Sequence, residues 1–253
     1  MWHLKDKKAL VTGGSKGIGR SCVEELAALG AEVIFTGRDT KDLKKLEEEL
    51  TAKGHRVKGI ASDVTSSHDR TKLWALVKDH FPHLDILVNN AGMNIRKPAV
   101  SYSDQEFREV MEVNLMAPFE LCRLFFAMLK SSPAASVINV ASVAATLDDH
   151  TGAPYGMAKS GLLQMTRSLA VEWASYGIRV NAVSPWFTLT PLTRGLLQQP
   201  EKIGPVLQRT PLRRVAEPHE ISSVIAFLAM DKASYITGQN IVADGGMSIN
   251  ALL

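Results

Sequence analysis

The chain has 253 residues, a formal net charge of +3 and a hydrophobic content of 45%. A chain of this length can bury a substantial core, and no shift in composition divides it, so we expect one domain over residues 1–253. Its basic residues are scattered rather than clustered, which argues against binding to nucleic acid. The apolar runs are too short to span a membrane, and no cluster of metal ligands stands out.

The cellular compartment is inferred from the N-terminal segment and the cysteines. No apolar run of signal-peptide length follows Met1, and the two cysteines, Cys22 and Cys122, stand far apart inside helix-like stretches. We therefore expect a reducing, cytoplasmic compartment and no disulfide framework. A plastid or mitochondrial location, reached through a transit segment since removed, stays open.

Short β-branched runs alternate with helical patterns along the chain. Strands are predicted at residues 8–12, 32–36, 57–61, 85–88, 137–140, 179–183 and 240–243. Helices are predicted at residues 20–29, 39–53, 69–80, 104–130, 155–175 and 219–229. This alternation predicts an α/β fold of the Rossmann type, a doubly wound parallel sheet flanked by helices. Ligands bind such sheets beyond the carboxyl ends of the strands.

A glycine-rich turn lies between the first predicted strand and the first predicted helix. Residues 12–19 have the sequence Thr-Gly-Gly-Ser-Lys-Gly-Ile-Gly. Glycines allow a tight turn and a close approach of backbone N–H groups to a pyrophosphate, and the helix N-terminus adds partial positive charge. In this position the turn indicates a dinucleotide site, with an ordinary glycine-rich turn as the alternative.

The end of the second predicted strand indicates which dinucleotide is bound. A free ribose 2′-hydroxyl usually meets an acidic residue there, whereas a 2′-phosphate meets arginine. The strand ends in Gly37 and Arg38, and Lys16 of the glycine turn offers a second positive charge. These residues favour NADP(H) as the cofactor. The alternative is that Arg38 and Lys16 are solvated surface cations that bind no ligand. Asp39 complicates this interpretation unless it caps the following helix.

Tyr155 and Lys159 are four residues apart in a predicted helix and therefore share a face. A neighbouring ammonium stabilises a phenolate and lowers the tyrosine pKa, which suits proton exchange near neutral pH. Ser142 follows a predicted strand, where its hydroxyl can hold a carbonyl oxygen. Asn114 stands in the long helical stretch 104–130, where its amide can bend the helix and hold a water beside Lys159.

Two further polar segments follow predicted strands. Asn89 and Asn90 precede Ala91 and Gly92, where small residues leave room for a cofactor and asparagine can tie strand ends together. Asp63 can accept a hydrogen bond from an adenine amino group, with a solvated loop acid as the alternative.

Taken together, these motifs resemble the short-chain dehydrogenase/reductase family from the glycine turn to Asp244-Gly245-Gly246. The resemblance implies a catalytic tetrad of Asn114, Ser142, Tyr155 and Lys159, and packing into a homotetramer or homodimer through the two long helices. It implies a cofactor half at about residues 1–140 and catalytic and substrate segments at about residues 141–253. The cofactor would be lined by Gly13, Ser15, Lys16, Gly17, Ile18, Gly19, Arg38, Asp63, Val64, Asn90, Ala91, Gly92, Tyr155, Lys159, Pro185, Thr188 and Thr190.

Within that family the chain is similar to tropinone-reductase-like proteins, through the sequence from Asn94 to Pro98 and the segment Pro185-Trp186-Phe187, among others. Trp186 stands where most relatives have glycine. The substrate wall is expected to comprise Ser142, Val143, Ala144, Leu147, Tyr155, Trp186, Phe187, Leu189, Leu192 and Leu196.

The sequence thus predicts NADPH-dependent reduction of a neutral, small or medium, cyclic or aryl ketone, with Tyr155 as acid and base. An amine substrate stays open, because Asp148, Asp149 and His150 lie near the expected site. One alternative is a 3-oxoacyl-[acyl-carrier-protein] reductase, disfavoured because the segments 130–134 and 174–177 are poor in basic residues. Another is an NADP(H)-sensing binding protein without turnover, disfavoured because all four tetrad residues are present.

Overall fold

Apolar and β-branched runs form the strands of one parallel sheet in the computed structural model, which describes residues 2–250. Their bounds are β1 (Lys8–Val11), β2 (Glu32–Gly37), β3 (Val57–Ala61), β4 (Ile86–Asn89), β5 (Ala135–Val140), β6 (Ile178–Pro185) and β7 (Asn240–Ala243). Their order in the sheet is β3-β2-β1-β4-β5-β6-β7. β1, β4 and β5 are buried over almost their whole length, as expected for strands covered on both faces.

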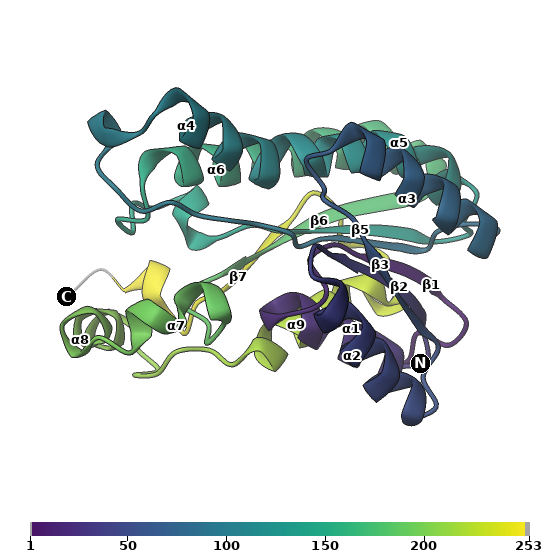
Figure 1. Ribbon diagram of the computed structural model, residues 1–253, viewed down its shortest axis with the longest axis horizontal. Coiled ribbons are helices and arrows are strands. Elements are labelled where there is room, and N and C mark those ends of the chain that lie inside the picture. The colour runs from purple at the N-terminus through teal and green to yellow at the C-terminus, as the bar shows by residue number, and fades with distance from the viewer. Residues whose placement is uncertain (1, 251–253) are drawn as a thin grey trace.

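Two helical layers cover the sheet (Figure 1). The helices are α1 (Gly17–Ala28), α2 (Thr40–Ala52), α3 (Ser67–His80), α4 (Asp104–Met111), α5 (Ala117–Lys130), α6 (Ala153–Trp173), α7 (Pro191–Leu197), α8 (Pro200–Arg209) and α9 (Pro218–Ala229). In Figure 1, α3, α4, α5 and α6 lie on one side of the sheet, and α1, α2 and α9 lie on the other. Among residues 2–250, no helix is long and apolar enough to cross a membrane.

Each face of the sheet carries its own hydrophobic core. On one face Val23, Leu46 and Ile225 bring α1, α2 and α9 against the strands. On the other face Phe125 and Leu169 bring α5 and α6 against them. Alternate strand residues point to opposite faces, so both layers are anchored by the same short strands.

The direction of chain progression reverses between β1 and β4. β1 pairs with β2 on one side and with β4 on the other, with Val11 opposite Phe35 and Val88. The connection after β4 therefore leaves the sheet on the opposite side from the connection after β1, which opens a crevice at the carboxyl ends of both strands. Doubly wound sheets bind their ligands at such a switch point.

A chain of buried hydrogen bonds holds the neighbouring ends of β4 and β5 against α6. The Asn89 amide donates to the Asn139 side-chain oxygen at 2.8 Å, and the Asn139 amide donates to the Thr166 hydroxyl at 2.9 Å. That hydroxyl donates to the Leu162 carbonyl at 2.8 Å. Buried polar groups so paired fix the relative positions of two strands and one helix.

The structure differs from the sequence prediction in two places. The helix predicted at residues 104–130 is interrupted at Glu112–Met116, which forms a π-helical turn between α4 and α5. The helices α7 and α8 were not predicted, because glycine and internal proline weaken their helical pattern. The other predicted strands and helices are confirmed, with ends shifted by at most three residues.

We predict that Asn139→Ala destabilises the fold. The variant deprives the Asn89 amide of its oxygen acceptor, leaving only the weaker Cys122 sulfur at 3.4 Å, and creates a small cavity. The free energy of unfolding should therefore fall by about 1–3 kcal/mol. Urea denaturation of the variant measures this. Gln164→Ala, which removes an exposed amide from α6, is the control and should shift stability by less than about 0.5 kcal/mol. Equal stability of the two variants would contradict a structural role for the buried chain.

Candidate active site

Thr12 and Asn90 join the carboxyl ends of β1 and β4. The Thr12 hydroxyl accepts from the backbone N–H groups of Asn90 and Ala91 at 3.0 and 3.1 Å. The Asn90 amide donates to the carbonyls of Thr12 and Gly13 at 2.9 and 3.1 Å. The asparagine expected to tie strand ends therefore does so, and it holds the glycine turn in place.

The glycine turn needs its glycines for backbone geometry and for space. Gly13 and Gly17 have φ values of +63° and +54°, a region that favours glycine. A Cβ atom on Gly19 would lie 2.1 Å from the Gly13 carbonyl oxygen. α1 begins at Gly17, and no side chain caps its first turn. The exposed N–H groups and the absence of side chains fit a dinucleotide pyrophosphate.

Three charged side chains near the end of β2 differ in whether another residue already engages them. Asp39 caps α2 by accepting from the backbone N–H groups of Lys41 and Asp42 at 2.9 and 3.3 Å, which answers the complication raised by the sequence. Lys16 forms an ion pair of 2.5 Å with Asp42. Arg38 is exposed, lines the cleft and forms no hydrogen bond or ion pair with any residue in the range 2–250. Arg38 is thus the cation most available to a 2′-phosphate.

Asp63 follows β3 but is engaged locally. Its carboxylate accepts from the backbone N–H and the hydroxyl of Thr65 at 2.9 and 2.8 Å. Burial raises the pKa of Asp63, but these hydrogen bonds and the charge of Arg38 outweigh burial and hold it below its ordinary value. The carboxylate is therefore ionised at neutral pH and can still accept a bond through its second oxygen.

A cleft of about 430 Å³ runs from the glycine turn to the start of α6. It brings together most of the predicted site, namely Gly13, Lys16, Gly17, Ile18, Arg38, Asn90, Ala91, Gly92, Ser142, Val143, Tyr155, Lys159, Pro185, Trp186, Phe187, Thr188, Thr190 and Leu192. A Cβ atom on Gly17 would lie 3.2 Å from the Thr190 side chain, so the segment after β6 closes over the glycine turn.

Asn114 lies in the π-helical turn and is fully buried. Its amide donates to the carbonyls of Met93 and Val110 at 2.8 Å each, and its oxygen accepts from the Met93 N–H at 3.3 Å. The Asn114 side chain thus bonds back to the carbonyl of the residue four positions earlier, at the start of the widened turn. Asn114 thereby binds the segment after β4, and its oxygen reaches the space beside Gly92 that the Lys159 amino group also approaches.

Tyr155 stands in the first turn of α6, which Pro154 helps to start. Burial raises the pKa of Tyr155 to about 12, while the Ser142 hydroxyl and the charge of Arg96 lower it and the charge of Asp149 raises it. Ser142 accepts from the Ala144 N–H at 3.2 Å, which orients its hydroxyl at the end of β5.

Lys159 is buried one turn further along α6, and its amino group donates to the Val140 carbonyl at 2.8 Å. The amino group lies 5.7 Å from the centre of the Tyr155 ring. Burial lowers the pKa of Lys159 to about 8. The sequence expectation that Lys159 lowers the Tyr155 pKa is not what the structure shows, because burial of the tyrosine dominates.

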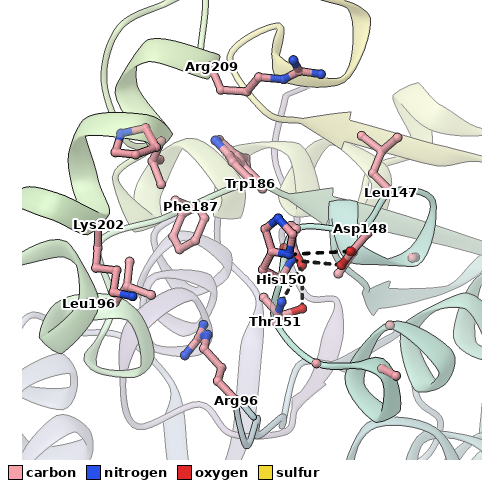
Figure 2. A pocket seen from close by; sticks show the side chains of 18 of the residues that line it. Arg96, Leu147, Asp148, His150, Thr151, Trp186, Phe187, Leu196, Lys202 and Arg209 are labelled. Carbon is pink, nitrogen blue, oxygen red and sulfur yellow. Dashed lines mark hydrogen bonds and ion pairs between the residues drawn. The ribbon is translucent and has the colours of Figure 1, made fainter. Parts of the chain in front are cut away.

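A wider pocket opens outward from the cleft (Figure 2). Ala144, Leu147, Trp186, Phe187 and Leu196 line it, as predicted for a substrate wall. The Trp186 and Phe187 rings meet edge to face with centroids 4.6 Å apart, and the Trp186 indole N–H donates to the Thr210 hydroxyl at 3.0 Å. The two rings therefore form a fixed apolar wall.

Some predicted residues lie elsewhere. Ser15, Gly19, Asp63, Val64 and Leu189 line neither the cleft nor the wider pocket. Val64 packs in the core. Gly19 shapes the turn because it has no side chain to collide with the Gly13 carbonyl. Conversely, the sequence analysis did not place Asn94, Arg96 and Thr151 in the cleft, although all three line it. They come from two loops that lack regular periodicity, so no sequence pattern showed where they point.

No group of three histidine, cysteine, aspartate or glutamate residues within 2–250 is arranged to hold a metal ion.

We predict that Lys159→Met changes how stability depends on pH. Lys159 is protonated in both states below about pH 8, and between there and 10.5 the unfolded chain holds more protons than the fold. Wild-type stability should therefore rise relative to Lys159→Met by on the order of 2 kcal/mol between pH 8 and 10. Urea denaturation across this range measures the difference, with Lys72→Met as an exposed control. Parallel pH curves for wild type and Lys159→Met would contradict the buried, depressed lysine.

Comparison with known proteins matches this geometry to a family. A family model described as "Enoyl-(Acyl carrier protein) reductase" matches residues 13–248. A tropinone reductase homologue of Arabidopsis thaliana is 44% identical over 250 residues, covering 98% of this chain and 95% of the relative. A second homologue from that plant, named as chloroplastic, is 43% identical over 98% of this chain and 78% of its own length.

The fold agrees with a solved structure as well. A gluconate 5-dehydrogenase from Burkholderia cenocepacia, described as a complex with NADP and tartrate, superimposes with a TM-score of 0.94 at 27% identity. The match covers 99% of this chain and 98% of that one. The predicted resemblance to tropinone-reductase-like proteins is confirmed, and the chain belongs to the short-chain dehydrogenase/reductase family of oxidoreductases.

Proposed function

We propose that the protein is an NADPH-dependent carbonyl reductase that converts a small or medium ketone to its alcohol, reversibly. The observation that carries the proposal is the meeting of Ser142, Tyr155 and Lys159 in one cleft with the glycine turn. The rings of Trp186 and Phe187 favour a cyclic or aryl substrate, since the apolar face of a ring packs well against an aromatic face.

NADP(H) is the cofactor that the residues at the end of β2 favour. Gly37 carries no carboxylate to repel a 2′-phosphate, Asp39 is engaged in capping, and Arg38 is available. The Burkholderia neighbour is described as holding NADP. Bound in the cleft, NADPH supplies the hydride.

The residues around the cleft have separate tasks in this proposal. Ser142 donates to the ketone oxygen, and Tyr155 passes its hydroxyl proton to that oxygen as negative charge develops there. A tyrosine with a pKa of about 12 keeps its proton until the ketone oxygen becomes strongly basic. Lys159 holds the end of β5 through the Val140 carbonyl and has N–H groups left for a ribose hydroxyl. Asn114 fixes the segment after β4 that forms the opposite wall.

A reductase of acyl-carrier substrates is the second candidate. The matching family model carries an acyl-carrier description, and Arg96, Lys202 and Arg209 line the wider pocket. Activity on a free ketone compared with an acyl-carrier thioester separates the two. A binding protein without turnover is the third candidate, and tight NADPH binding with no activity on a carbonyl panel would favour it.

Assembly and location are proposed on similar grounds. Exposed apolar residues on α5 and α6, among them Phe119 and Val171, fit a homotetramer or homodimer packed through these helices. We propose a cytoplasmic location, with a plastid as the alternative because one relative is named as chloroplastic.

Tyr155→Phe is predicted to abolish most turnover while keeping cofactor binding. The hydroxyl supplies the proton and the ring supplies the packing, so kcat should fall roughly 10²–10⁴-fold with NADPH affinity little changed. Ketone-dependent loss of NADPH absorbance and NADPH titration measure the two quantities. Tyr176→Phe, at an exposed ring outside the cleft, is the control. A loss below tenfold would mean that another group donates the proton.

Arg38→Gln is predicted to lower the preference for NADPH over NADH. The ratio of kcat/KM for the two cofactors should drop at least about tenfold, because a two-pronged contact with the phosphate is lost. Lys45→Gln, on an exposed position of α2, is the control. We avoid Gly37→Asp, because a Cβ atom there would lie 3.0 Å from the Ser15 hydroxyl. A wild type that prefers NADH, or an unchanged ratio, would refute the role of Arg38.

A further inference from the structure

The segment after β4 carries an arginine that faces both cavities. Arg96 lines the cleft beside Tyr155 and also the wider pocket. In Figure 2 its side chain extends into the pocket from the side opposite Trp186. Arg96 is exposed and is therefore accessible to a molecule that extends from the cleft into the wider pocket.

The backbone around Arg96 is fixed on both sides. The Tyr102 hydroxyl donates to the Ile95 carbonyl, and Lys97 forms an ion pair with Glu106. Glu106 also accepts from the Ser103 N–H at 2.8 Å, as part of the cap of α4. Ile95 and Lys97, on either side of Arg96, are thus held by contacts with Tyr102 and Glu106, while the Arg96 side chain lies in the pocket.

Arg96 itself makes no hydrogen bond or ion pair with any residue between 2 and 250. Its charge nevertheless acts on the catalytic hydroxyl, because it lowers the pKa of Tyr155. An arginine without a protein partner, on a fixed loop and within electrostatic range of the reacting group, is suited to bind an anion that arrives with the substrate.

Asn94 adds a second, independent observation on the same segment. Both polar atoms of its side chain are buried and have no partner within the described chain, and the residue lines the cleft. A buried amide without partners is costly unless a ligand or a water satisfies it. Its N–H groups are donors, so Asn94 and Arg96 present donors from alternate residues of one segment.

The acidic residues nearby are engaged by their own loop. Asp149 accepts from the Thr151 hydroxyl at 2.6 Å and from its N–H at 3.2 Å. Asp148 accepts from the His150 N–H at 3.0 Å. Glu201 lines only the wider pocket, from α8. None of these carboxylates neutralises Arg96, because Arg96 has no ion-pair partner in the range described.

We propose that the physiological ketone carries a carboxylate, which Arg96 binds through its guanidinium while Asn94 donates a hydrogen bond to the same end of the substrate. This inference rests on the proposed ketone reductase function and departs from the neutral ketone that the sequence indicated. The ring of such a substrate packs on Trp186 and Phe187, and its carbonyl oxygen meets Ser142 and Tyr155.

Matched cyclic ketones test the proposal. The substrates are 3- and 4-oxocyclohexanecarboxylate, the corresponding carboxamides as neutral isosteres, and 4-aminocyclohexanone as a cation. The wild type should reduce the better carboxylate with at least about tenfold higher kcat/KM than its carboxamide. Arg96→Gln should remove most of this ratio, and Arg96→Lys should keep part of it, because it retains the charge without the two-pronged geometry. The ratio matters because effects of the substitution on folding and on cofactor binding apply equally to both substrates.

Lys202→Gln is the matched control, since it removes one positive charge from the α8 side of the wider pocket. It should leave the carboxylate-to-carboxamide ratio within about twofold of wild type. An equal fall in both variants would assign the effect to the general field of the pocket and overturn the role of Arg96. A wild type that prefers the carboxamide or the amine would also overturn it.

A binding measurement separates this inference from the proposed function. Calorimetry follows cyclohexanecarboxylate and cyclohexanecarboxamide binding to the protein in the presence of NADP⁺. Tighter binding of the carboxylate, lost at least about tenfold in Arg96→Gln, supports the anion site even if no ketone is reduced. Equal binding of the two probes, or binding unaffected by Arg96→Gln, refutes the anion site even if ketones are reduced.

Discussion

The contact between Thr12 and Asn90 is the constraint on which the site depends. Alternation of apolar residues fixes which face of a strand is buried, but it does not by itself set where two parallel strands end relative to each other. The Asn90 amide and the Thr12 hydroxyl set this for β1 and β4. Because a side chain at Gly19 would collide with Gly13 and Asn90, the same contact also fixes the start of α1. The glycine turn and the segment that carries Arg96 both take their positions from this junction.

Sequence reasoning found the parts whose geometry is local. The spacing of Tyr155 and Lys159 places both on one face of α6, and the helix carries them into the cleft as expected. The same reasoning gave the wrong direction for the Tyr155 pKa, because burial is a property of the whole fold and not of spacing. The predicted helix at residues 104–130 was too simple, since only the tertiary contact between Asn114 and Met93 reveals the π-helical turn. Arg96 could not be found, because irregular loops have no period from which a direction can be read.

Two loops of opposite charge act on the Tyr155 hydroxyl. Arg96, after β4, lowers the pKa of Tyr155, and Asp149, before α6, raises it. Both influences are smaller than the effect of burial, so the packing of the cleft sets the protonation state and the loops adjust it. The strand ends and α6 hold Ser142, Tyr155 and Lys159 in place. Substitutions in the two loops can therefore change the charge near Tyr155 without moving these residues.

The same arrangement couples substrate charge to the acid. An anion bound to Arg96 cancels the positive charge that lowers the Tyr155 pKa, so the tyrosine holds its proton more tightly once such a substrate is in place. In the proposed reaction the proton leaves as charge develops on the ketone oxygen, beside the Ser142 hydroxyl. A neutral substrate would leave the positive charge of Arg96 uncompensated and would form no ion pair with it. In this proposal one side chain, Arg96, links the charge of the substrate to the acidity of Tyr155, and no hydrogen bond within residues 2–250 depends on it.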